Sequence, residues 1–163
     1  MGYIETLISR YRHKGLLIDT NLLLLYFVGK HDPERISKFK RTMAFTIEEF
    51  ILLAKFFNMF DRVITTPNVL TEVSNLLGGL PEQLHSAFFN DLATRLPLLE
   101  EHYTSSATIS ASAHFSRFGL TDCGIVELVK DNYLVLTDDL PLAGYLENCK
   151  IDVINFNHLR RII

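Results

Sequence analysis

The sequence predicts an α/β fold in which a mainly parallel sheet is covered by helices on both faces. Short apolar runs that are typical of buried strands alternate along the chain with longer segments of helical period. Parallel strands need long crossover connections, and these place helices on both faces of the sheet. The 163 residues, of which 48% are apolar, suffice for one domain with a hydrophobic core. We therefore expect a single three-layer α/β/α domain spanning residues 1–163.

The first half of the chain contains two of the expected strands. The expected elements are, in order, a helix over 3–13, a strand over 16–19, helices over 21–29, 34–42 and 46–58, and a strand over 62–66. Gly29 is expected to end its helix, because glycine is common just after helix C-termini. Pro33 is suited to start the next helix. Thr46 and Glu49 form a plausible capping box for the third.

The second half continues the alternation. The expected elements are helices over 67–77 and 82–95, a short strand over 98–103, helices over 105–118 and 121–130, a strand over 133–137, a helix over 139–148 and a strand over 151–156. Gly119 is the expected break between two of these helices. The earlier helix over 46–58 has an unusually broad apolar surface. That breadth indicates burial on two sides or a surface for a partner, such as a second copy of the chain.

Composition narrows the classes of function. The net charge of −3 argues against a strongly electrostatic nucleic-acid binder, so a protein of this kind that acts on nucleic acid should bind weakly or through a metal ion. Cys123 and Cys149 form no metal-type pair, and the six histidines contain no pair at i, i+4, which gives a zinc site little support. The first fifteen residues lack the apolar core of a signal peptide, and charged or polar residues interrupt the apolar segments. We expect a cytoplasmic protein without a membrane segment.

Acidic side chains lie at or directly after the ends of two expected strands. Asp19 is the last residue of the strand over 16–19, in the stretch LLIDTN, and is followed by Thr20 and Asn21. Asp138 and Asp139 come directly after the strand over 133–137. In a parallel sheet the functional crevice lies beyond the carboxyl ends of the strands. These acids are therefore expected to share one edge of the sheet.

Two further acids lie on helices that are expected to pack beside this edge. Glu72 is in the second turn of the helix over 67–77, on the flank of its apolar stripe, and Asp122 opens the helix over 121–130. Each acid also has a simpler interpretation, as a helix cap or a solvated surface residue. Carboxylates gathered at one edge, however, raise one another's pKa unless a cation lies among them. Oxygen-only clusters suit Mg²⁺ or Mn²⁺, which can activate water for attack at phosphorus.

Three segments resemble, in order and context, the motifs of the PIN domain family: LLIDTN, TTPNVLTEV and GLTDCGIVELVKDNYLVLTDDLPLAGYL. The similar region runs from about Leu16 to Phe156. The resemblance implies an α/β/α sandwich with three or four acids around Mg²⁺ or Mn²⁺, and a metal-dependent ribonuclease as in many members. Some members are toxins of toxin–antitoxin pairs, so the implied partners are an RNA substrate and an antitoxin protein, with a homodimer as a further expectation.

The resemblance also assigns roles to residues. The implied metal ligands and catalytic acids are Asp19, Glu72, Asp122 and Asp139, with Asp138 as the alternative to Asp139 and with Thr20, Asn21 and Thr137 as supporting residues. Two departures from the family pattern stand out. Cys123 occupies a place where the family often has alanine, and the segment over 31–60 is longer than in a minimal member.

Other functions compete with this interpretation. A catalytically inactive PIN-like domain could serve as an RNA- or protein-binding module. A receiver-like signalling domain is disfavoured because no lysine directly follows a late strand, and a phosphohydrolase with a DxD nucleophile is disfavoured because Asn21 replaces the second aspartate. Basic stretches over 10–14, 38–41 and 160–161 could contact phosphates, although solvated surface charge is their simpler interpretation.

Overall fold

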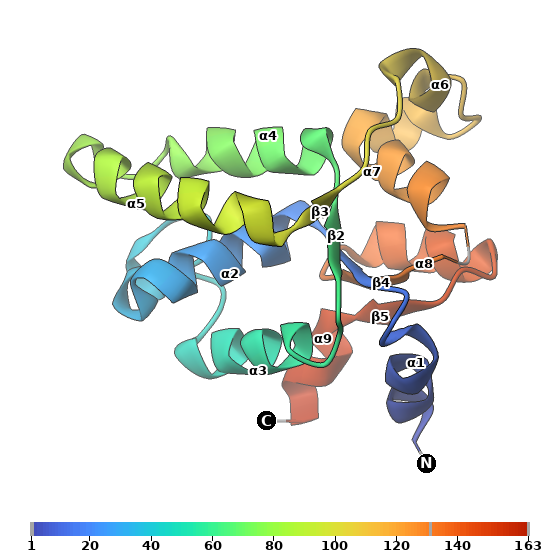
Figure 1. Ribbon diagram of the computed structural model, residues 1–163, viewed down its shortest axis with the longest axis horizontal. Helices are drawn as coiled ribbons and strands as arrows, with labels where there is room; N and C mark the ends of the chain where they lie inside the picture. Colours follow the sequence, from blue (N-terminus) through green and yellow to red (C-terminus); the bar gives the residue numbers. More distant parts are fainter. Residues whose placement is uncertain (1, 131, 163) are drawn as a thin grey trace.

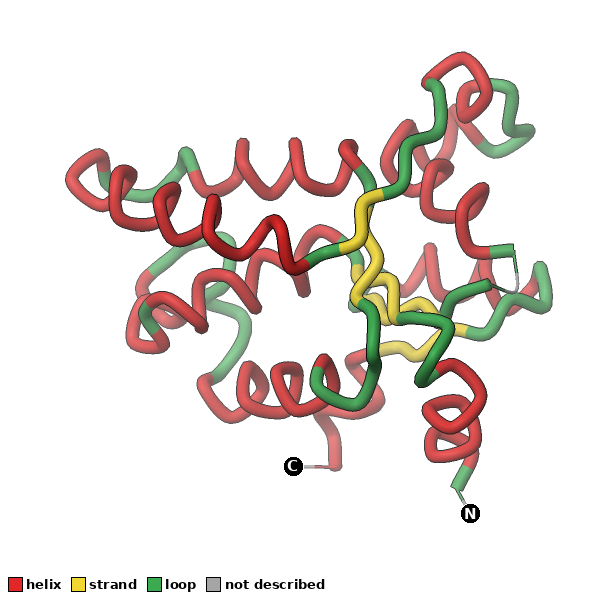
Figure 2. Tube along the Cα trace, viewed as in Figure 1, coloured by secondary structure: helices red, strands yellow, loops and turns green. Residues whose placement is uncertain are grey.

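The computed structural model describes residues 2–130 and 132–162, and a five-stranded sheet lies at its centre. All neighbouring strands are parallel, in the order β3-β2-β1-β4-β5. The strands are β1 (Leu16–Ile18), β2 (Val63–Thr65), β3 (Glu100–Glu101), β4 (Leu134–Thr137) and β5 (Val153–Asn155). Figure 2 shows them in yellow between two groups of helices. The predicted three-layer α/β/α fold is confirmed.

The helices divide between the two faces of the sheet (Figure 1). The first group, to the left of the sheet in this view, is α2 (Thr20–His31), α3 (Ile47–Phe57), α4 (Pro67–Leu77) and α5 (Glu82–Arg95). The second group, to the right, is α6 (Ser106–Ser110), α7 (Phe115–Val129) and α8 (Leu140–Asn148). The remaining elements are α1 (Tyr3–Tyr11), α9 (Phe156–Leu159) and the 3₁₀ helices η1 (Pro33–Lys38), η2 (Leu96–Leu98) and η3 (Arg160–Ile162). Within the described part of the chain, no helix combines the length and apolarity that crossing a membrane requires.

The central strands are uninterrupted apolar runs because helices cover both of their faces. The side chains of Leu16, Leu17 and Ile18 are fully buried, and so are those of Leu134, Val135 and Leu136. In the register of the sheet Ile18 lies opposite Leu136. Asp19 and Thr137, the next residue of each chain segment, therefore lie at the same edge of the sheet. The expectation that acids would meet beyond the strand ends depends on this register.

The apolar surface of α3 is mostly covered within the chain. Phe50, Leu53, Phe56 and Phe57 are each no more than 8% exposed, whereas Ile51 is 44% exposed. The predicted capping box is confirmed, since Thr46 and Glu49 each accept a hydrogen bond from the backbone N–H of the other. Burial on two sides accounts for the breadth of the apolar surface. A homodimer through this helix stays a prediction.

Three predicted helices differ from those in the structure. α2 does not end at Gly29 but continues to His31, because Gly29 is buried where Phe50 of α3 packs against it. The segment over 34–42 forms the 3₁₀ helix η1, which is followed by turns instead of an α-helix. The buried hydroxyl of Thr42 closes this segment by donating a hydrogen bond to the carbonyl of Ile36 at 2.9 Å. The expected helix over 105–118 is interrupted after Ser110, where small residues offer little apolar surface to bury. The predicted break at Gly119 is confirmed by its positive φ of 75°.

The contact between Gly29 and Phe50 leads to a prediction for the packing of α2 on α3. A Cβ atom at position 29 would lie 2.3 Å from a ring carbon of Phe50. We expect Gly29→Ala to lower the free energy of unfolding by about 1–3 kcal/mol through overpacking. Gly144→Ala is the matched control, because no atom lies within 4 Å of its Cβ position in α8. It should raise stability by about 0.5–1 kcal/mol. Urea unfolding midpoints of both variants test this, and a stabilised Gly29→Ala would contradict it.

Candidate functional site

Four of the predicted acids line one cavity at the carboxyl edge of the sheet. Asp19 lies at the junction of β1 and α2, Glu72 on α4, Asp122 on α7 and Asp139 at the junction of β4 and α8. The cavity has a volume of about 310 Å³ and opens to solvent. Thr20, Asn21 and Thr121 contribute polar groups to its wall, and Leu76, Phe118 and Leu142 contribute apolar ones. The fold thus brings together acids that are far apart in the sequence.

Asp19 is both a helix cap and a wall of the cavity. Its Oδ1 accepts the backbone N–H of Leu22 at 3.1 Å, which caps α2. Its Oδ2 accepts the backbone N–H of Asp138 at 3.0 Å and the hydroxyl hydrogen of Thr137. Asp19 is only 5% exposed, and these bonds fix the orientation of its carboxylate. The capping interpretation and the site interpretation of LLIDTN therefore apply to the same side chain.

Burial, together with a smaller contribution from the negative charge of Asp138, raises the pKa of Asp19 to about 8. The hydrogen bonds from Thr137, Leu22 and Asp138 oppose this shift. A carboxylate that has lost its water and faces another acid is unfavourable as an anion unless a cation or a proton offsets its charge. Asp19 is thus a buried acid, and no positively charged side chain of the described residues contributes to its pKa shift.

Asp122 is affected by the other acids of the cavity. Burial raises its pKa to about 6, with smaller contributions in the same direction from the charges of Asp139 and Glu72. Asp122 lies just beyond Gly119, whose left-handed backbone redirects α7 toward the cavity. The carboxylates of α4, α7 and the β4–α8 junction are therefore close enough to interact electrostatically.

Two threonine hydroxyls hold Glu72. Thr20 Oγ1 donates to Glu72 Oε2 at 3.0 Å, and Thr121 Oγ1 donates to Glu72 Oε1 at 2.5 Å. Thr20, one of the residues expected to support the acids, therefore donates its hydroxyl hydrogen to the acid of α4. Thr121 is absent from the residues that the sequence predicted. The available signal was its place directly before Asp122, at a helix start where hydroxyl side chains often bind nearby polar groups.

The structure separates Asp138 from Asp139. Asp139 lines the acidic cavity and caps α8 by accepting the N–H of Leu142 at 2.9 Å. Asp138 lines a neighbouring hollow instead and accepts a weak hydrogen bond from Asn21 Nδ2 at 3.4 Å. Thr137 connects both sides, since its hydroxyl donates to Asp19 and accepts the N–H of Asp139 at 3.0 Å. Of the two alternatives for the fourth acid, Asp139 faces Glu72 and Asp122.

The donor set of the cavity suits a hard divalent cation, although the side chains do not form a finished coordination shell. In residues 2–130 and 132–162, no three acids, histidines or cysteines are grouped closely enough to hold a metal ion as they lie. The four facing groups are all carboxylates, which Mg²⁺ and Mn²⁺ prefer. Burial and the neighbouring acids raise the pKa values of Asp19 and Asp122, and a cation bound among these carboxylates would offset both effects. The residues fit such an ion in chemistry.

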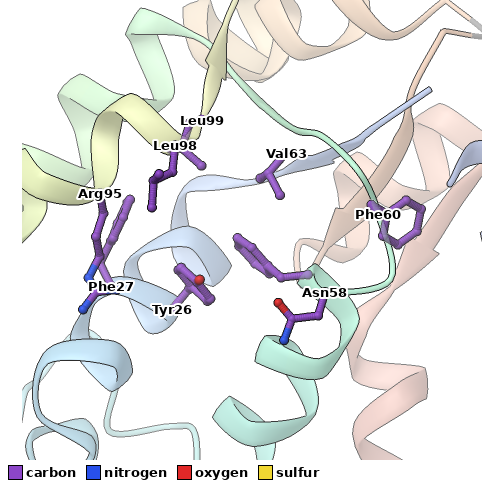
Figure 3. A pocket seen from close by; sticks show the side chains of 9 residues that line it. Tyr26, Phe27, Asn58, Phe60, Val63, Arg95, Leu98 and Leu99 are labelled. Atoms are coloured by element: carbon purple, nitrogen blue, oxygen red, sulfur yellow. The ribbon is translucent and has the colours of Figure 1, made fainter. Parts of the chain in front are cut away.

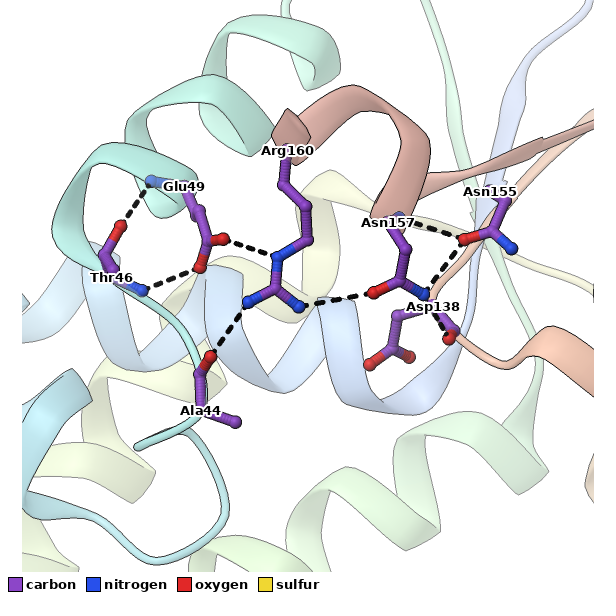
Figure 4. Close-up of polar contacts among 7 residues, drawn as sticks. All are labelled: Ala44, Thr46, Glu49, Asp138, Asn155, Asn157 and Arg160. Carbon is purple, nitrogen blue, oxygen red and sulfur yellow. Dashed lines mark hydrogen bonds and ion pairs between the residues drawn. The ribbon is translucent and has the colours of Figure 1, made fainter. Parts of the chain in front are cut away.

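A polar network ties Asp138 to the distant helix α3 (Figure 4). Asn157 Nδ2 donates to the carbonyl of Asp138 at 2.8 Å, and Asn157 Oδ1 accepts a bond from Arg160 Nη1 at 3.3 Å. Arg160 also pairs with Glu49 at 2.5 Å and donates to the carbonyl of Ala44 at 3.0 Å. The sequence offered Arg160 as a phosphate contact. In the structure its guanidinium instead joins the C-terminal segment to the start of α3.

A second cavity lies near the amino ends of β2 and β3, away from the acids (Figure 3). It has a volume of about 250 Å³. The ring of Tyr26 stacks on that of Phe57 with 3.9 Å between centroids, and Leu98 and Leu99 form a further wall. Arg95 is paired with Asp91 at 2.7 Å. No acid is among the described residues that line this cavity, so it offers none of the carboxylate chemistry of the first.

No protein-family model matches the chain, and searches of curated proteins and of solved structures find no match either. The similarity to PIN domain motifs therefore stays an interpretation of the sequence.

Proposed function

We propose that this protein is a PIN-like, metal-dependent endoribonuclease that hydrolyses phosphodiester bonds of RNA. The observation that supports this most is the single cavity lined by four carboxylates from four separate segments of the chain. The proposed ligands of Mg²⁺ or Mn²⁺ are Asp19, Glu72, Asp122 and Asp139. When bound, such an ion would activate water and offset the charge that develops on the phosphate oxygens.

The side chains around the acids have separate tasks in this proposal. Thr137 and the N–H of Asp138 orient Asp19, and the hydroxyls of Thr20 and Thr121 orient Glu72. Such hydrogen bonds to carboxylates are the usual support of metal-binding groups. The uncompensated negative charge of the cavity repels a phosphate. The chain would therefore accept the substrate backbone here only when a cation offsets that charge.

A binding module without catalytic activity is the second candidate. The observation in its favour is that, among the described residues, no three acids are grouped closely enough to hold an ion as they lie. Such a domain would bind RNA or a protein without cutting RNA. An antitoxin partner and a cytoplasmic location remain predictions from the sequence.

Cleavage of a mixed RNA pool tests the proposed activity. The wild-type protein should cut with Mn²⁺ or Mg²⁺ and should not cut with EDTA. Asp122→Asn should lower the rate by about 10- to 100-fold or more, because even residues that only support metal ligands have effects of that size. Glu127→Gln is the matched control, since Glu127 lies on the same helix but pairs with Lys130 at 2.8 Å outside the cavity. Its rate should stay within about twofold of the wild type, as expected for a surface substitution.

Two results would count against the nuclease. Equal cleavage by Asp122→Asn and by the wild type would mean that the cavity is not the site. RNA binding without cleavage at any metal concentration would favour the binding module.

A further inference from the structure

A second hollow continues directly from the acidic cavity, and Glu72 is the one charged side chain among the described residues that line it. Its volume is about 380 Å³. It shares Glu72, Leu120 and Thr121 with the acidic cavity, so the two are contiguous. Its remaining lining consists of amide, hydroxyl and ring groups: Pro67, Asn68, Thr71, Tyr103, Thr104 and Ser106. Neutral polar groups of this kind can contact the edges of a nucleobase by hydrogen bonds.

The side chain of Tyr103 projects at this hollow from the connection between β3 and α6. Tyr103 is 79% exposed, the most exposed large apolar or aromatic residue of the described chain. The chain on both sides of it is anchored. The N–H of His102 donates to the carbonyl of Thr65 at 3.0 Å, and Ser105 caps α6 by accepting the N–H of Thr108 at 3.2 Å. The backbone is thus anchored on both sides of Tyr103, while its side chain stays largely exposed.

Charge decides which interaction can bind a nucleic acid here. No lysine, arginine or histidine is among the described residues that line either the acidic cavity or the adjoining hollow. Within these two hollows, basic side chains of the described residues are therefore not available to contact phosphates. Stacking of a base on an aromatic ring can supply local affinity, since every base has a π face and the interaction needs no protein charge.

We propose that Tyr103 stacks on an unpaired base of single-stranded RNA, next to the phosphate held at the acidic cavity. The neutral groups of Asn68, Thr104 and Ser106 contact the edge of the same nucleotide. This subsite rests on the proposed function, because it assigns a neighbouring nucleotide to the same substrate. It explains how a chain with a net charge of −3 can hold an RNA strand beside four carboxylates.

The chain contains no tryptophan, so a substitution can place a single fluorescent reporter in this hollow. We would prepare Tyr103→Trp in the Asp122→Asn background, which the proposed function expects to leave RNA uncut. The matched control is Tyr3→Trp in the same background, since Tyr3 is 69% exposed on α1, far from α6 in Figure 1. In the presence of Mn²⁺, titration with an eight-nucleotide single-stranded RNA should quench the tryptophan at position 103 to saturation and leave that at position 3 unchanged.

Affinity measurements complete the test. Tyr103→Ala should weaken binding of this RNA by about 5- to 150-fold, the range expected for removing one stacking ring. Tyr103→Phe should stay within about twofold of the wild type, because stacking needs the ring and not the hydroxyl. Because the side chain is exposed, none of these changes should disturb folding, which circular dichroism checks.

The results separate this inference from the proposed function. Quenching at position 103 without cleavage by the wild-type protein supports the subsite and overturns the nuclease. Cleavage by the wild type, with no quenching and with unchanged affinity in Tyr103→Ala, overturns the subsite alone. Failure of every variant to bind the RNA overturns the subsite as well.

Discussion

The metal-free wild-type protein should lose stability as the pH rises from 6 to 8, and Asp19→Asn should remove most of this loss. Burial raises the pKa of Asp19 to about 8, whereas an aspartate in an unfolded chain titrates near 3.9. Between these values the folded state binds more protons than the unfolded state. The free energy of unfolding therefore falls as the pH rises through this window, by up to about 1.4 kcal/mol per pH unit.

Asparagine at position 19 cannot titrate, so this contribution disappears. The slope that Asp122 contributes should remain, but only up to about pH 6, where burial has moved its pKa. The two proteins should consequently differ most between pH 6 and pH 8. Asparagine can still cap α2 through its Oδ1, but its NH₂ group would face the N–H of Asp138. The readout is therefore the slope of stability against pH and not its absolute value.

Urea unfolding in EDTA at several pH values measures this slope. Asp32→Asn is the control, because Asp32 is a partly exposed aspartate that pairs with Arg35 away from the cavity. Its slope should equal that of the wild type. An unchanged slope in Asp19→Asn would mean that Asp19 does not carry the uncompensated charge.

Added Mn²⁺ should reverse the effect in the wild-type protein. An ion that binds the folded state at 100 times its Kd stabilises that state by about 2.7 kcal/mol. The gain should grow with pH, since the metal competes with protons for the carboxylates. Asp19→Asn should lose most of it. This measurement tests metal binding without requiring a substrate.

Arg160→Met is expected to have the largest effect on stability outside the core. Its guanidinium pairs with Glu49, a residue only 8% exposed, and also donates to Ala44 and Asn157. Removing one partner of a buried pair leaves the other charge without compensation. We expect a loss of about 2–4 kcal/mol, near the lower end of the range for buried pairs because the Arg160 side chain is 27% exposed.

Two further variants make this prediction specific. Arg161→Met, at the exposed neighbouring position, should change stability by less than about 0.5 kcal/mol. The double variant Arg160→Met with Glu49→Gln should recover part of the loss, because it removes the unpaired carboxylate. Equal unfolding midpoints for the variants at 160 and 161 would contradict a structural role for Arg160. The network in Figure 4 would then not hold the C-terminal segment to α3.

Local signals were sufficient for most of the secondary structure. The apolar runs at β1 and β4, the capping box of Thr46 with Glu49 and the break at Gly119 are each visible in a few neighbouring residues. Signals of this kind failed where distant contacts decide the backbone. Glycine is common at helix ends, yet Gly29 lies inside α2, where Phe50 packs against it.

By itself the sequence determined the fold class and the acids that lie beyond the strand ends, because the hydrophobic period and the turn residues reflect local preferences. Only the tertiary structure decided which groups face one another. It separated Asp138 from Asp139, turned Thr20 toward Glu72 and added Thr121 to the cavity. It also committed Arg160 to Glu49 and left Tyr103 exposed beside the acids. The physical reason is that side-chain partners come from elements far apart in the chain, and their distances depend on how the sheet and helices pack.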